Sequence, residues 1–472
     1  MDPFLLAPPS RAREIHRSHG AGVQLRRWWM LTTIVLAGAV LRLWGLGAHR
    51  LDFDEAFTAM AGRLPLRGLF DYLRVRDSHP PLDYLLHAPL ARAGVDEFLF
   101  RLPSAVCSIG AVALFAWWMR RRGFSGIVAT GLLAVSAFQL THGREARMYA
   151  EMELIGVGVA VLAESWLRRP RRWHAAVLAA LVFVGLLTHV SMFLLGAGLV
   201  VLAGRRTDRD AWRWRLALGA GAVGWAVLWG SSFLVQSRGG HSDWIPRTTF
   251  DGMIHTFGRL VTYQPALHVF VLAAVAAGAV LLVRADRQLG RVWLCCVLVP
   301  AALAALTGTV APVLLDRTLT VVSWGPLLAL GVLVDAAASR SRLLGAIVVL
   351  VLVAVMVPPA IHAVTEPSAP DRVLRHVEAV TGPGDVVAIH PGGRLHELLW
   401  SVGVRDSQPY QPVSLVGFGD STGFVLSPDA PRTGHLWILD WTKHALPVPT
   451  LPRCAPDWSG GGARLYCLVG GH

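Results

Sequence analysis

The sequence is almost free of lysine, because 43 of its 44 basic residues are arginine and Lys443 is the exception. It has no HExxH motif and no pair of CxxC motifs, so a metalloprotease or a structural zinc site is not predicted. No glycine-rich phosphate loop precedes a predicted helix, which leaves cytosolic nucleotide use without support. No internal repeat or low-complexity tract is evident.

The net charge of +13 raises the question of a nucleic-acid partner. The arginines, however, form short clusters between apolar runs, whereas a nucleic-acid-binding face needs them gathered on one folded surface. The clusters lie at 26–27, 120–122, 168–172, 205–215, 284–291 and 340–342. This is how a membrane protein marks its cytoplasmic loops, so no nucleic acid is predicted as a partner.

The apolar residues, 54% of the 472, come in long runs that favour the lipid bilayer as the main solvent. Apolar segments occur at 29–46, 103–119, 124–140, 150–167, 174–188, 190–203, 216–235, 265–283, 292–307, 319–338 and 343–361. We therefore predict a polytopic α-helical protein of the cell membrane with about eleven transmembrane helices.

The arginine clusters fall on the cytoplasmic side if the N-terminus is cytoplasmic. The prediction is a cytoplasmic segment at 1–28 and a transmembrane domain at 29–361, with long outer loops at 47–102 and 236–264. The first apolar run is too long for a signal peptide and is read as an uncleaved anchor. Within the first outer loop, residues 56–75 show helical spacing typical of a helix lying flat in the membrane interface.

The pattern changes near residue 362, where helix and strand signals alternate with proline and glycine. A small extracytoplasmic α/β domain is predicted for 362–472, with helices near 371–380 and 393–403 and strands near 385–390, 435–441 and 463–470. Cys454 and Cys467 both lie in this outer tail, where a disulfide between them is chemically allowed but not fixed by their spacing. The other three cysteines are read as small apolar residues of the spans.

Asp54 and Glu55, just after the first span, are the first candidates for chemistry. One interpretation is that they only solvate the loop. They are, however, embedded among apolar side chains, and a half-buried carboxylate is expected to gain proton affinity and become a better general base.

Further candidates are expected on the same outer side. Asp77 and His79 precede a Pro-Pro turn and Asp83 follows it, and His79 either contacts substrate or caps the next helix. Arg144 and Arg147 are spaced to share a helical face and to bind a phosphate, and Tyr149 follows them. The remaining outer candidates are His189, Asp243 and Arg317, each with a purely structural role as the alternative.

Five motifs in this order resemble the GT-C type membrane glycosyltransferases near glycosyltransferase family 39, the protein mannosyltransferases and their aminoarabinose-transferring relatives. The motifs are LDFDEAFTAMAG, SHPPLDYLL, EFLFRLPSAV, REARMYAEMEL and DRTL, within about residues 29–340. The resemblance implies a GT-C-like fold and a polyprenyl-phosphate sugar donor, with Asp54 as the base, Glu55 in support, and Arg147 and Arg317 at the lipid phosphate.

The expected reaction is transfer of a sugar, mannose by family default, to an extracytoplasmic protein, glycan or lipid acceptor. Because no second carboxylate is assigned as nucleophile, inversion at the sugar is predicted. No cofactor or metal is predicted, with a divalent cation held by Asp52, Asp54 and Glu55 as the open alternative. The rival functions are a transporter or flippase of lipid-linked glycans and a scaffold without catalysis.

Overall fold

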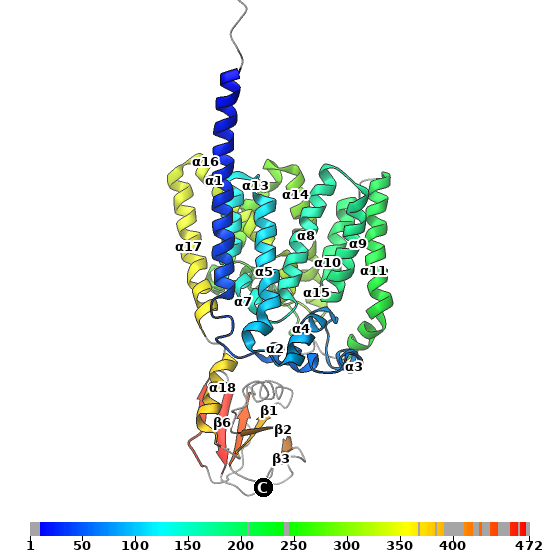
Figure 1. The fold of residues 1–472 in the computed structure, drawn as a ribbon, viewed down its shortest axis with the longest axis vertical. Coiled ribbons are helices and arrows are strands. Elements are labelled where there is room, and N and C mark those ends of the chain that lie inside the picture. Colours follow the sequence, from blue (N-terminus) through cyan, green and yellow to red (C-terminus); the bar gives the residue numbers. More distant parts are fainter. Residues whose placement is uncertain are drawn as a thin grey trace, which may run out of the picture.

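A computed structural model describes residues 10–204, 207–239, 245–366, 369–382, 385–390, 410–418, 424–426, 435–441, 454–460 and 463–468. Helices form one bundle, and a smaller α/β unit lies beyond one end of it (Figure 1). The long helices are α1 (Ser10–Leu43), α5 (Glu97–Met119), α8 (Tyr149–Arg168), α9 (Arg172–Thr188), α11 (Arg209–Gln236), α13 (His268–Ala285), α16 (Trp324–Arg340) and α17 (Arg342–Thr365).

Several helices of the bundle are bent or broken. α6 (Gly123–Val135) and α7 (Ala137–Arg144) meet at 51°, and η3 (Asp316–Val322) meets α16 at 62°. α14 (Arg287–Trp293) continues through the π-helical turn η2 (Leu294–Leu298) into α15 (Val299–Val310), and α10 (Met192–Ala203) is short. Within the described residues, five helices are long and apolar enough to cross a membrane, or up to seven if each bent pair is one span. The predicted count of eleven is therefore not confirmed.

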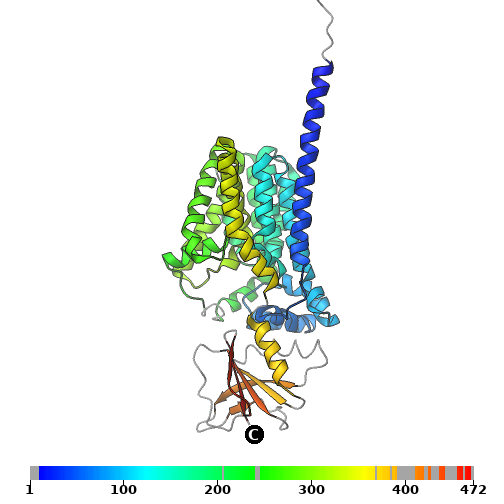
Figure 2. The ribbon, with the colours of Figure 1, turned by 90° about the vertical axis from the view of Figure 1, so that its left-hand side faces the viewer.

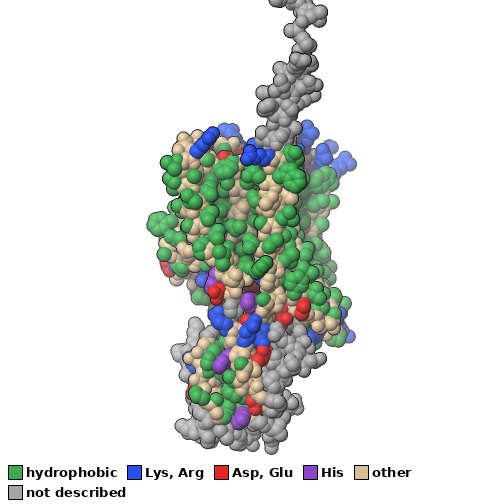
Figure 3. Space-filling view, turned by 60° about the vertical axis from the view of Figure 1, so that its left-hand side comes forward, with side chains coloured by type: hydrophobic (Ala, Val, Ile, Leu, Met, Phe, Trp, Pro, Cys, Tyr) green, Lys and Arg blue, Asp and Glu red, His purple; other side chains and the backbone are tan. Residues whose placement is uncertain are grey.

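The bundle has the surface of a multi-pass membrane protein. Figure 3 shows hydrophobic side chains along its sides and arginines gathered at the end from which α1 extends. At this end Arg122 pairs with Glu164 and Asp286, which joins three helix connections far apart in the sequence. We call it the arginine-rich rim, formed by residues 120–122, 164–172 and 284–291.

Short helices lie across the opposite end of the bundle, as Figures 1 and 2 show. They are α2 (Phe53–Gly62), α3 (Leu66–Arg76), α4 (Leu82–Ala93), α12 (Phe250–Arg259) and the 3₁₀ turn η1 (Pro265–Leu267). The flat helix predicted over 56–75 is thus two helices, because Pro65 interrupts the chain between α2 and α3. We call this end the α2–α4 rim.

A capping box starts α2. The Asp52 carboxylate accepts a hydrogen bond from the amide of Glu55, and the Glu55 carboxylate accepts one from the amide of Asp52, both at 3.0 Å. The capping box therefore fixes the backbone from which the side chain of Asp54, the second residue of α2, projects. Pro81 precedes α4, so the Pro-Pro turn does start that helix.

The C-terminal α/β unit consists of α18 (Ala369–Val380) and a six-stranded sheet in the order β3-β2-β1-β4-β6-β5. The strands are β1 (Asp385–His390), β2 (Tyr410–Phe418), β3 (Phe424–Leu426), β4 (Leu436–Asp440), β5 (Trp458–Gly460) and β6 (Ala463–Leu468). β1 is parallel to β2 and β4, and the other pairs are antiparallel. Cys454 and Cys467 form a disulfide. The helix predicted at 393–403 lies outside the described residues.

The α/β unit is joined to the α2–α4 rim through α18. The amide of Arg50 donates to the Asp371 carboxylate at 3.0 Å, and the Arg50 guanidinium pairs with Glu378. Arg375 donates to the carbonyl of Ala48 at 2.8 Å. Because residues 48–50 lead directly into the capping box of α2, this junction also helps to place the first turn of α2.

Gly156 of α8 allows η3 to pack closely, since a Cβ at this position would lie 2.1 Å from the carbonyl oxygen of Val321. We predict that Gly156→Ala lowers the melting temperature of the detergent-solubilised protein, because overpacking costs about 1–3 kcal/mol. Gly158→Ala is the matched control: there a Cβ meets only Leu114 at 3.9 Å, and alanine favours a helix by about 1 kcal/mol. Equal melting temperatures for the two variants would contradict this packing.

Candidate active site at the α2–α4 rim

Asp54 and Arg317 meet at the α2–α4 rim although 263 positions separate them in the sequence. α2 carries the carboxylate and η3 carries the guanidinium, with 2.6 Å between Oδ2 of Asp54 and Nη1 of Arg317. The two side chains are 29% and 28% exposed, so the pair is open to a ligand while still partly shielded from water. Tyr149, at the start of α8, is buried with its ring 5.9 Å from the Arg317 guanidinium.

Arg147 lies behind this pair and is 3% exposed. Its Nη1 donates to the backbone carbonyl of Asp54 at 3.3 Å, to the hydroxyl of Thr58 at 2.8 Å and to the hydroxyl of Tyr84 at 3.0 Å. Its Nε is buried and has no hydrogen-bond partner. Arg147 therefore fixes the first turn of α2 and adds a positive charge close to the Asp54 carboxylate.

A chain of polar groups from the loop before α4 supports Arg147. The hydroxyl of Tyr84 donates to the Asp77 carboxylate, and Nδ1 of His79 lies 2.9 Å from the other oxygen of Asp77. His189 packs against His79, with 5.3 Å between ring centres, and its Nδ1 accepts a hydrogen bond from the amide of Ser191. Asp77, His79 and His189 thus lie close to Arg147 at the same end of the bundle.

The surrounding charges set the ionisation of the site. Burial alone would raise the pKa of the Asp54 carboxyl, but Arg147, Arg317 and His79 together hold this pKa below its ordinary value. The expectation of a raised proton affinity is therefore wrong for Asp54, because sequence reasoning weighed desolvation without the two guanidinium groups.

Glu55 has a different environment from its neighbour. Its carboxylate is 1% exposed and accepts hydrogen bonds from Nε and Nη2 of Arg101 at 2.7 and 2.6 Å. It also accepts from the amide of Ala146 at 2.8 Å. Glu55 therefore joins α2 to α5 and to the loop that carries Arg147, and its geometry is that of a positioning residue.

Arg144 lies apart from Asp54. Its guanidinium donates to the carbonyl of Trp44 at 2.7 Å and lines a cavity of about 360 Å³ whose wall also contains Asp52, Glu55 and Arg101. The predicted helical face shared with Arg147 is wrong, because α7 ends at Arg144 and Glu145 adopts an extended backbone. Asp243 lies outside the described residues.

Three residues of this constellation had no assigned role in the sequence: Thr58, Tyr84 and Arg101. All three belong to the motifs that carry the family resemblance, but neither spacing nor residue type indicates their partners. Asp52, Asp54 and Glu55 bind different groups instead of converging. In the part of the chain that the structure describes, no three His, Cys, Asp or Glu side chains form a group that could hold a metal ion.

Two crystal structures of ArnT, the aminoarabinose transferase, from Cupriavidus metallidurans are similar to this chain. The apo structure gives a TM-score of 0.57 and the structure bound to undecaprenyl phosphate 0.56. Each is 16% identical in sequence, and the alignment covers 93% of this chain and 98% of ArnT. The chain has the GT-C fold of ArnT. No family model and no curated protein matches the chain. The prediction of a GT-C-like fold is thus confirmed by the similarity to ArnT.

Because Glu55 is buried and Asp54 is partly exposed, their substitutions should lower the stability of the protein by unequal amounts. Glu55→Gln leaves the buried Arg101 without its counter-charge, a loss that typically costs about 3–5 kcal/mol. Asp54→Asn changes a partly exposed pair, which is worth about 1 kcal/mol or less. Thermal unfolding in detergent should show a clear drop in melting temperature for Glu55→Gln and little change for Asp54→Asn. The reverse order would contradict the assignment of Glu55 as a positioning residue.

Proposed function

We propose that this chain transfers a sugar from a polyprenyl-phosphate donor to an acceptor at the outer face of the membrane. The observation that carries the proposal is the Asp54–Arg317 pair backed by Arg147 at the α2–α4 rim. A carboxylate next to two guanidinium groups provides both a base and a site for a phosphate. The ArnT structure with bound undecaprenyl phosphate supports a lipid phosphate as the ligand of this fold.

The proposed orientation follows from the arginine-rich rim, which belongs in the cytoplasm by the positive-inside rule. The α2–α4 rim and the α/β unit then lie outside. In this scheme residues 1–28 are cytoplasmic, 29–361 form the catalytic membrane domain and 362–472 form the extracytoplasmic domain. A polyprenyl phosphate in the outer leaflet would place its phosphate at the depth of the helices that cross this rim.

In the proposed reaction the acceptor hydroxyl oxygen attacks the anomeric carbon while the bond from that carbon to the phosphate oxygen breaks. The proton of the hydroxyl passes to the Asp54 carboxylate, and the electron pair of the broken bond leaves with the polyprenyl phosphate. Arg317 offsets the charge that develops on this phosphate. Because one carboxylate serves as base and none as nucleophile, a single displacement inverts the anomeric configuration.

The pairing of Asp54 with Arg317 suggests an order of events. A donor phosphate that binds Arg317 competes with Asp54 for the same guanidinium. The pKa of Asp54 then rises, since a neighbouring positive charge has been neutralised by the phosphate and burial continues to disfavour the carboxylate. Asp54 thus becomes the stronger base when the donor is in place. Arg147, held by Tyr84 and Thr58, keeps the backbone of Asp54 fixed throughout.

The sugar to test first is mannose, which the sequence resemblance implies, followed by an aminopentose, the sugar type of ArnT. The rival function is a flippase for a lipid-linked glycan. A flippase moves its cargo without breaking the bond between sugar and phosphate. Release of free polyprenyl phosphate together with a glycosylated acceptor distinguishes the two.

Asp54→Asn should lower the rate of sugar transfer by about 10²–10⁴-fold, the usual contribution of a general base. Donor binding should persist, because Arg317 and Arg147 remain. The measurement is transfer of labelled sugar from polyprenyl phosphate in proteoliposomes, with donor affinity determined in parallel. Transfer at the wild-type rate by Asp54→Asn would remove Asp54 as the base.

Arg317→Gln should move the acidic limb of the pH–rate profile to higher pH. In the wild type Arg317 helps to depress the pKa of Asp54, so the base of the free enzyme stays ionised down to acidic pH. Without Arg317 that pKa rises, and kcat/KM should begin to fall at a higher pH as the medium is acidified. The donor KM should also increase. An unshifted profile would show that Arg317 does not act on Asp54.

A further inference from the structure

The C-terminal α/β unit contains a cavity of about 780 Å³ that the proposed reaction does not use. This volume is within the range of small-molecule sites, about 300–1,000 Å³. The cavity lies between α18 and the edge of the sheet formed by β4, β6 and β5. Its wall contains the aromatic rings of Trp437 and Trp458, the imidazoles of His376 and His435, and the carboxylates of Asp385 and Asp457.

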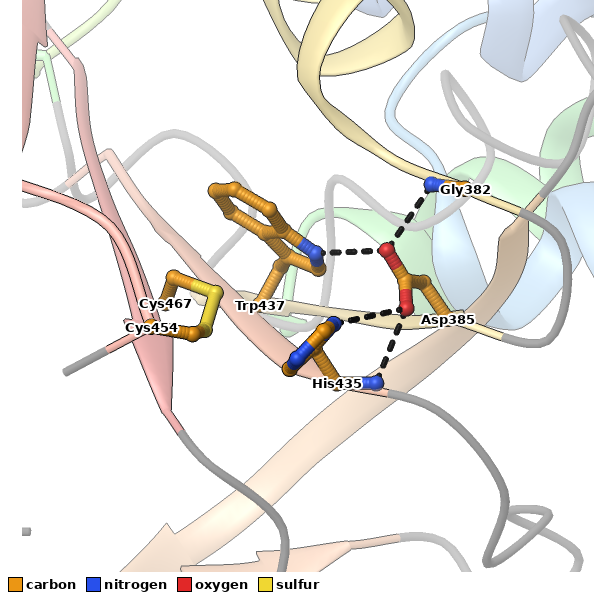
Figure 4. Close-up of a disulfide and its surroundings, with 6 residues drawn as sticks. All are labelled: Gly382, Asp385, His435, Trp437, Cys454 and Cys467. Carbon is orange, nitrogen blue, oxygen red and sulfur yellow. Dashed lines mark hydrogen bonds and ion pairs between the residues drawn. A yellow bond between two sulfur atoms is a disulfide. The ribbon is translucent and has the colours of Figure 1, made fainter. Parts of the chain in front are cut away.

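Hydrogen bonds connect several residues of the cavity wall, as Figure 4 shows. Asp385 accepts hydrogen bonds from the amides of Gly382 and His435 at 2.8 Å and from Nε1 of Trp437 at 2.9 Å. The disulfide between Cys454 and Cys467 lies against the same wall and ties the segment before β5 to β6. A preformed wall of this kind lowers the entropy cost of holding a ligand.

The side chains of the wall suit a carbohydrate. The ring of Trp458 is stacked on His376, with ring centres 4.1 Å apart and planes at 17°, which presents a flat, braced aromatic surface. The C–H faces of a sugar ring pack well on such a surface. The His435 side chain is 53% exposed and can donate or accept a hydrogen bond to a hydroxyl.

The charges disfavour a phosphate in this cavity. Among the described residues that line it there is no lysine or arginine, while two carboxylates are present. An anionic ligand would therefore meet repulsion, whereas neutral hydroxyl groups find both donors and acceptors. This is the opposite of the Asp54 site, where the partly exposed guanidinium of Arg317 and the buried guanidinium of Arg147 both lie close to the carboxylate.

We propose that this cavity binds a carbohydrate chain and thereby holds the acceptor of the transferase. The role of the cavity in holding the acceptor rests on the function proposed above, whereas carbohydrate binding by the cavity does not depend on it. α18 connects the cavity to the segment that leads into the transfer site. His376 lies five residues after Asp371 on α18, roughly 8 Å along the axis, and Asp371 binds the amide of Arg50, just before the capping box of α2.

Calorimetric titration of the purified full-length protein in detergent tests the proposal. The probes are mannotriose and arabinotriose, with inorganic phosphate as the anionic comparison. We expect the wild type to bind at least one trisaccharide, and Trp458→Ala to bind it at least tenfold more weakly. Trp173→Ala is the matched control: the Trp173 ring also lies against a histidine, His174, but Trp173 is next to the arginine-rich rim, and its loss should leave binding unchanged.

His435→Ala is the second variant, because its side chain is half-exposed and its loss should spare the fold. It should weaken trisaccharide binding with an unchanged melting temperature. Absence of binding by the wild type, or equal binding by Trp458→Ala and the wild type, would overturn the carbohydrate site. So would binding of phosphate in preference to both trisaccharides.

A transfer assay separates this inference from the proposed function. With a glycan acceptor, Trp458→Ala should raise the acceptor KM at least tenfold while kcat at saturation and the donor KM stay unchanged. Asp54→Asn should lose transfer and still bind the trisaccharide. Transfer by a wild type that binds no trisaccharide would overturn the cavity alone. Trisaccharide binding without any transfer would overturn the acceptor role and the transferase together.

Discussion

The Glu55 carboxylate is the point on which the candidate site depends. It binds the guanidinium of Arg101 on α5 and the amide of Ala146 in buried contacts, and the amide of Asp52 in a partly buried one. A buried charge pair is stable only when its remaining hydrogen-bonding capacity is satisfied, and here it is. The pair therefore locks α2 and the loop after α7 against α5. Asp54 is adjacent to Glu55 and Arg147 is adjacent to Ala146, so the side chains of Asp54 and Arg147 are held close to each other.

In the proposed mechanism the charges around Asp54 suit a ligand that brings its own negative charge. Arg147 is buried and committed to backbone and hydroxyl groups, whereas Arg317 reaches Asp54 from a short 3₁₀ turn and stays partly exposed. A phosphate can exchange with Asp54 at Arg317 without disturbing Arg147. In this account one guanidinium is structural and the other changes partners, and that exchange sets when the carboxylate acts as a base. The close approach of α8 and η3 at Gly156 keeps Arg317 within reach.

Much of the fold could be predicted because long apolar runs and arginine clusters report the bilayer directly. The segments at 150–167 and 343–361 match α8 and α17 closely. The positions where helices bend or end are harder to predict from the sequence, because they depend on tertiary contacts. Gly143 precedes the extended backbone at Glu145 but remains within α7, so the residue pattern does not mark where this helix ends, and the spacing wrongly places Arg144 beside Arg147. β2 and β5 are also not predicted from the sequence. Their stability comes from pairing with β1 and β6 more than from their own residue pattern.

For the site, residue type identified Asp54, Asp77, His79 and Arg147 as candidates, but not their bonds. The different environments of Asp54 and Glu55 cannot be inferred from the sequence. They arise because Arg317 pairs with Asp54 and Arg101 pairs with Glu55, and both arginines come from distant positions. The same limit explains the wrong sign of the pKa expectation for Asp54. Desolvation can be inferred from apolar neighbours in the sequence, whereas a guanidinium that comes from a position 263 residues away cannot.

A structure of this chain in lipid nanodiscs with bound undecaprenyl phosphate would show which guanidinium group holds the lipid phosphate. We expect the phosphate to lie within hydrogen-bonding distance of Arg317, the Asp54–Arg317 contact to be broken and Arg147 to keep its bonds to Thr58 and Tyr84. A phosphate bound at the arginine-rich rim, or one bound with the Asp54–Arg317 contact intact, would contradict it.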